Sequence, residues 1–147
     1  MAEAKEFIGL DGRQVIEQAI REAEESTSGE IRVHIEARLE EEEVKDRAAH
    51  LFAALKMHKT KMRNGVLFYL AYEDHQFAIL GDKGINQKVP DDFWEHIKDE
   101  MQAEFKQSRF AAGLAKGVEM AGEALKQYFP LKKDDINELP DEVSFRK

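Results

Sequence analysis

The chain has 147 residues, the usual size of one domain, with 22 basic and 30 acidic residues and a formal net charge of −8 at pH 7. Nucleic acid is therefore not an expected partner, because binding a phosphate backbone requires a basic patch. Cysteine is absent, which excludes disulfides, thiolate metal sites and a cysteine nucleophile.

The first part of the chain predicts a helix followed by a strand. Residues 1–7 contain no apolar run, and no stretch approaches the roughly 20 apolar residues of a membrane span, so we expect a cytoplasmic monomer that does not insert into a membrane. Apolar residues recur at helical spacing over residues 11–27. After Gly29, apolar and polar residues alternate from 31 to 38, which favours a half-buried strand at or near a sheet edge.

The middle of the chain predicts a second helix and then a hairpin. An acidic run, residues 40–43, precedes helically spaced apolar residues at 44–55, where carboxylates favour the positive end of a helix. Residues 66–72 and 76–80 are nearly continuous apolar runs, which indicates two inner strands at the sheet centre. Two glycines and a proline within residues 81–90 then predict a long loop.

The last part of the chain predicts two helices and a tail. Helical spacing begins after Pro90 and continues to about residue 107, and a final helix runs from about residue 108 to Pro130. We expect a single domain over residues 1–130 and a charged, poorly ordered tail over residues 131–147. The order of elements predicts an α/β fold, a three-layer α/β/α sandwich in which helices cover both faces of a small mixed sheet.

Oxygen-bearing side chains stand at the predicted ends of the central strands. Asn64 precedes one inner strand, Asp82 directly follows the next, and Asp91 and Asp92 begin the third long helix. Hard divalent cations take such oxygen ligands, and α/β folds place ligand crevices at strand ends. Glu30, just before the first strand, joins the set if that strand begins at the same end of the sheet. Helix capping by the two adjacent aspartates and turn formation by Asn64 are the structural alternatives.

Other sites have less support from the sequence. The five histidines are scattered without ligand spacing, which disfavours a zinc site. The sequence contains no nucleophile elbow, phosphate-binding glycine loop or His-Glu-x-x-His motif, so no catalytic residue is assigned.

Several segments, in their order and spacing over about residues 10–129, resemble the TPM domain family, which includes thylakoid-lumen acid phosphatase-like proteins and bacterial TPM domain proteins. The matching segments are Ser28-Gly29-Glu30-Ile31-Arg32-Val33, Arg63-Asn64-Gly65-Val66-Leu67, residues 77–85, Val89-Pro90-Asp91-Asp92-Phe93, and residues 105–114. The resemblance implies an apical cleft that binds divalent cations, with Asn64, Asp82, Asp91 and Asp92 as its residues, and an acid phosphatase activity in some members. The chain departs from the commoner Gly-Tyr-Gly-Leu-Glu-Gly loop, since Asp82 replaces the aromatic residue and Asn86 the glutamate.

Three functions follow as hypotheses. The first is a divalent-cation module, calcium before Mg²⁺ or Mn²⁺, with Glu30 and the four residues above as ligands. The second is a metal-dependent phosphatase in which Arg63 or Lys83 holds the anion. The third is a non-catalytic interaction module that docks an unknown protein partner through its acidic surface or its first strand.

Overall fold

The structure is a computed structural model that describes residues 4–131 and 143–145. The helices are α1 (Ala4–Glu24), α2 (Val44–Ala54), α3 (Lys83–Asn86), α4 (Phe93–Phe105) and α5 (Phe110–Tyr128), together with the short 3-10 helix η1 (Met57–Lys59). The strands are β1 (Glu30–Glu36), β2 (Gly65–Ala71), β3 (Gln76–Gly81) and β4 (Ser144–Phe145).

The four strands form one mixed sheet in the order β3-β2-β1-β4. β1 runs parallel to both β2 and β4, whereas β2 and β3 form the antiparallel hairpin. The register pairs Glu30 with Gly65 at one end of β1 and Glu36 with Ala71 at the other. The N-terminal ends of β1 and β2 therefore lie together with the C-terminal end of β3.

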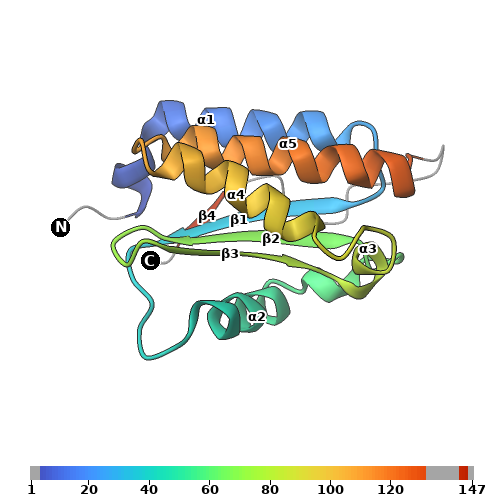
Figure 1. Ribbon diagram of the computed structural model, residues 1–147, viewed down its shortest axis with the longest axis horizontal. Helices are drawn as coiled ribbons and strands as arrows, with labels where there is room; N and C mark the ends of the chain where they lie inside the picture. The colour runs from blue at the N-terminus through green and yellow to red at the C-terminus, as the bar shows by residue number, and fades with distance from the viewer. Residues whose placement is uncertain (1–3, 132–142, 146–147) are drawn as a thin grey trace.

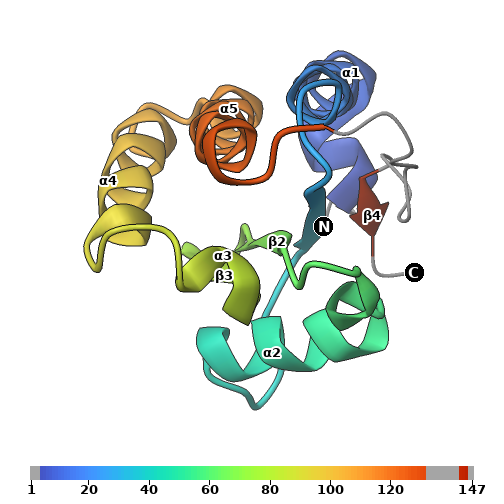
Figure 2. The same cartoon turned by 90° about the vertical axis from the view of Figure 1, so that its right-hand side faces the viewer.

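Helices cover both faces of this sheet (Figures 1 and 2). α1, α4 and α5 lie on one face and α2 on the other, so the predicted three-layer α/β/α sandwich is confirmed. The larger apolar core lies under α1, α4 and α5, and a smaller one lies under α2. No described helix combines the length and the apolar character needed to cross a membrane.

The structure corrects the predicted exposure of β1 and the predicted place of β3. β1 was predicted to expose one face, but only Arg32 among its residues is not fully buried, and Arg47 of α2 bonds to Glu36 at its end. β1 does lie near a sheet edge, as predicted, because only the two-residue β4 lies outside it. β3 was predicted to be an inner strand, yet it forms the opposite edge of the sheet and is partly exposed.

Three element boundaries also differ from prediction. α1 begins at Ala4 rather than near residue 11, and the backbone at Gly9 interrupts it with φ 76° and ψ 166°, a conformation open to glycine. The predicted loop 81–90 contains the four-residue helix α3. Most of the predicted tail lies outside the described residues, but Val143 is buried and Ser144 and Phe145 form β4.

Candidate functional site

Three of the predicted ligand residues lie side by side at one end of the sheet. Glu30 N–H donates to the Asn64 carbonyl at 3.4 Å, and Asp82 N–H donates to the Gly65 carbonyl at 2.9 Å. These bonds join the start of β1, the start of β2 and the end of β3. Glu30, Asn64 and Asp82 therefore form one row across adjacent strands, and we call this row the sheet rim.

The side chains of the sheet rim are buried although all three are polar. Glu30 is 2% exposed, Asn64 1% and Asp82 7%. The Asn64 amide nitrogen donates to Ser28 Oγ at 3.2 Å, and its backbone N–H donates to Thr60 Oγ1 at 3.1 Å. Among the described residues, nothing donates a hydrogen bond to Asn64 Oδ1, which is fully buried. A buried amide oxygen without a donor is costly and calls for a ligand or water.

Asp82 is held by an arginine. Arg63 Nε donates to Asp82 Oδ2 at 2.7 Å, and Arg63 Nη2 donates to Oδ1 at 3.0 Å, so both carboxylate oxygens are engaged. The bond to Asp82 raises the pKa of Arg63. The sequence pattern had suggested Arg63 as a clamp for an external anion, whereas its guanidinium binds a carboxylate of the chain itself.

The helix α3 fixes the chain around this pair. Asp82 caps α3 by accepting a bond from the Lys83 backbone N–H at 2.8 Å, and Gly84 N–H donates to the Arg63 carbonyl at 2.8 Å. The side chain of Asn86 is also used locally, since it donates to the Gly81 carbonyl and accepts from Trp94 Nε1 at 2.7 Å. The sequence signal for α3 was Asp82 itself, a favoured N-cap residue.

Asp91 and Asp92 do not join the sheet rim. Both are exposed and precede α4. Asp92 is the N-cap of α4 but makes no capping bond through its side chain, so its predicted capping bond is absent. Within residues 4–131 and 143–145, no three His, Asp or Glu side chains lie close enough together to hold a metal ion.

The chain was compared with the sequence models of known protein families. The sequence model of the TPM domain matches residues 3–124, most of the chain. The chain belongs to the TPM domain family. A comparison with curated proteins gives no match. β4 lies beyond the matched part of this TPM domain.

Solved structures agree with this assignment. The chain is 52% identical to the BA42 protein from the psychrophilic bacterium Bizionia argentinensis, with a TM-score of 0.85 over 92% of this chain and 93% of that one. The N-terminal domain of the cg2496 protein from Corynebacterium glutamicum is 17% identical, with a TM-score of 0.65 over 80% of this chain and 74% of that one. The N-terminal domain of a P. gingivalis protein is 21% identical, with a TM-score of 0.68 over 82% and 78%. The last two show the fold alone.

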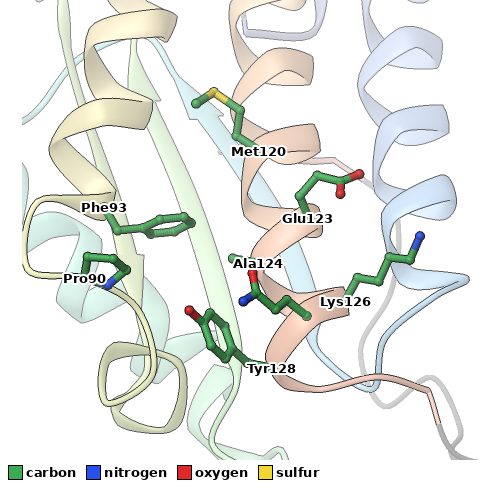
Figure 3. Close-up of a pocket in the computed structure, with 8 residues that line it drawn as sticks. Pro90, Phe93, Met120, Glu123, Ala124, Lys126 and Tyr128 are labelled. Atoms are coloured by element: carbon green, nitrogen blue, oxygen red, sulfur yellow. The ribbon is translucent and has the colours of Figure 1, made fainter.

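A surface groove of about 600 Å³ lies between the start of α4 and the end of α5 in this TPM domain. Figure 3 shows Pro90 and Phe93 on one side of it and Tyr128 and Met120 on α5. The sequence did not predict this groove. Its lining residues differ from those of the sheet rim.

A third buried carboxylate, which the sequence pattern did not reveal, lies at the opposite end of β1. Glu36 accepts from Arg47 Nε at 2.9 Å and Nη2 at 2.8 Å, from Tyr69 Oη, and from His34 Nε2 at 3.1 Å. Burial alone raises the pKa of Glu36, but the bonds from these three side chains outweigh it and hold the pKa well below its usual range. His34 Nδ1 lies 2.7 Å from Ser144 Oγ, which links β4 to the network.

Proposed function

We propose that this TPM domain binds a divalent cation at the sheet rim, with calcium as the first candidate and Mg²⁺ or Mn²⁺ as alternatives. One observation carries the proposal: backbone bonds bring the buried residues Glu30 and Asp82 to either side of the start of β2, where the buried Asn64 Oδ1 has no donor among the described residues. Buried carboxylates are costly unless positive charge or hydrogen bonds compensate them. A bound cation gives Asn64 Oδ1 a partner and adds positive charge beside these carboxylates.

The donor set fits a hard cation. Carboxylate and amide oxygens are the ligands that Ca²⁺ takes, and backbone carbonyls and water complete its shell. The rim supplies only two carboxylates, and Arg63 already engages one of them. Because calcium affinity rises with the number of charged ligands, we expect a dissociation constant on the order of 10⁻⁴ to 10⁻³ M. Asp91 and Asp92 are left out of this ligand set because both are exposed.

Calcium titration into chelator-treated protein, followed by amide NMR, tests the proposal. Saturable shifts at residues 30, 64 and 82, with a rise in melting temperature, are the expected result. The same titration with Mg²⁺ separates the two ions. An unchanged spectrum and melting temperature at about 10 mM of every ion, some tenfold above the weakest expected constant, would falsify the proposal.

Two variants distinguish calcium binding at the sheet rim from attraction of the ion by the overall negative charge of the chain. Asp82→Asn removes a rim charge and should weaken calcium binding by about tenfold or more, because one charged ligand of two is lost. Glu41→Gln removes the same charge from an exposed position in the acidic run and should leave the affinity within about twofold, since exposed charges are screened. Equal losses in the two variants would indicate a diffuse counterion effect.

Phosphatase chemistry and docking of a protein partner stay predictions. In the part of the chain that the structure describes, no contact favours either of them over cation binding.

A further inference from the structure

Arg63 occupies the position on Asp82 that a cation would need. Its planar fork spans both carboxylate oxygens, at 2.7 Å and 3.0 Å. A calcium ion approaches carboxylate oxygens to about 2.3–2.6 Å, which would place it against the guanidinium. Two positive charges at that separation repel each other, so the ion and the observed pair exclude one another.

The arginine side chain is free to leave while its backbone stays in place. The Arg63 side chain is 38% exposed, whereas Asp82 is 7% exposed. The Arg63 carbonyl accepts the Gly84 N–H at 2.8 Å, so α3 keeps the loop in position when the side chain turns outward. Water can solvate the released guanidinium, and the buried carboxylate then needs a new positive partner.

We infer that Arg63 is a resident competitor for the cation, so that cation binding at the sheet rim is an exchange in which the guanidinium leaves Asp82. The inference rests on the proposed function and adds how the affinity of the site is set. Only the fraction of molecules with Arg63 turned away is competent to bind, and the apparent affinity is reduced by that fraction. The same competition keeps Asp82 paired when no cation is bound.

Calorimetric titration of Arg63→Gln with calcium tests this exchange. Removing the competitor should tighten calcium binding by roughly fivefold to a hundredfold, the usual range of coupling between two ligands. Lys83→Gln is the matched control, because it removes an exposed positive charge next to Asp82 and leaves the backbone N–H that bonds to the carboxylate. It should change the affinity by less than about twofold.

The outcomes separate this inference from the proposed function. If the natural chain binds calcium and Arg63→Gln binds equally or more weakly, the exchange is wrong and cation binding stands. If Lys83→Gln gains as much as Arg63→Gln, general charge explains the gain and the exchange is also wrong. Binding by Arg63→Gln alone would support the exchange in its strongest form. Absence of binding in both proteins overturns both ideas.

A measurement on the natural chain covers the case in which Arg63→Gln fails to fold. The Arg63 Nε–H proton is hydrogen-bonded to Asp82 and should be protected from exchange with water. Saturating calcium should abolish that protection as the amide of residue 82 shifts. A shifted residue 82 with a fully protected Arg63 Nε–H would contradict the exchange.

Discussion

Two arginine–carboxylate pairs lie at opposite ends of the sheet, and they differ in how firmly they are held. Glu36 is 1% exposed and receives donors from Arg47, His34 and Tyr69, which belong to α2, β1 and β2. Among the described residues, the Asp82 side chain accepts only from Arg63 and from one backbone N–H. Arg47 is 21% exposed and Arg63 38%. The first pair is part of the core, and the second is a surface arginine on a buried carboxylate.

The number of side-chain donors distinguishes the two buried carboxylates, Glu36 and Asp82. Three side chains satisfy Glu36 and hold it ionised, so a further ligand would have to break a complete network. Asp82 is paired with one partly exposed side chain, so replacing that partner breaks fewer contacts. The same residue chemistry therefore gives a network with three side-chain donors at one end of β1 and, at the other, the pair for which we propose cation exchange.

The largest expected effect comes from Glu36→Gln. The variant leaves the Arg47 guanidinium without a counter-charge in a largely buried place, and breaking such a pair costs about 3–5 kcal/mol. Urea unfolding at neutral pH, with the slope compared to that of the natural chain, measures the loss. A loss below about 1 kcal/mol, the value of an exposed pair, would show that Glu36 is not locked.

A smaller effect is expected from Gly84→Ala, which tests the support of the second pair. A Cβ at Gly84 would lie 2.1 Å from the Met62 carbonyl oxygen and 2.5 Å from that of Arg63, so the backbone must move. Such overpacking costs about 1–3 kcal/mol, and the displaced loop should also lose calcium binding. Gln87→Ala, at an exposed position after α3, is the control and should retain both stability and binding. A fully stable Gly84→Ala would contradict the close packing of α3.

Acidification should weaken the hydrogen-bond network of Glu36. The pKa of Glu36 is lower in the folded state than in the unfolded state, where it is about 4.3. Its stabilising contribution is therefore present above that pH and is lost as the pH falls below it. Going from about pH 6 to about pH 3.5, this one group should remove about 1 kcal/mol of stability. Comparing the natural chain with Glu36→Gln isolates the term, since the variant should lose that much less. Parallel losses in the two proteins would contradict an ionised Glu36.

The sequence predicted the positions of the strands in the chain better than the contacts that surround them in the fold. Alternation at Ile31, Val33 and Ile35 identified β1, and the apolar runs identified the hairpin, because local periodicity reflects burial. Its polar positions misled the prediction of exposure. His34 and Glu36 look solvent-facing in the sequence, but Glu36 accepts from Tyr69 and Arg47. His34 bonds to Glu36 and to Ser144, which is distant along the chain. Contacts of this kind leave no local pattern.

The candidate site was predictable to a similar extent. Asn64 and Asp82 had to meet because the two strands of a hairpin begin and end at the same edge. Glu30 joined them only because β1 runs parallel to β2, which periodicity does not reveal. Asp91 lies outside the row because α3 and a turn follow Asp82 before α4 begins, and its role as a ligand stays a prediction. The pairing of Arg63 with Asp82 depends on side-chain geometry alone.

The smallest effect on stability, and the sharpest contrast with Glu36, is expected from Asp82→Asn. The released Arg63 is already well exposed and gains water in place of the carboxylate, and asparagine keeps an oxygen that can accept from the Lys83 N–H. The loss in urea unfolding should therefore be less than roughly half of that in Glu36→Gln, because a solvated charge costs little. Arg63→Gln should cost more than Asp82→Asn, because it leaves the buried Asp82 carboxylate without its positive partner. Losses of unfolding free energy equal to that of Glu36→Gln in both variants would mean that the rim pair stabilises the fold as much as the core pair. Arg63 would then be bound too strongly to exchange with a cation.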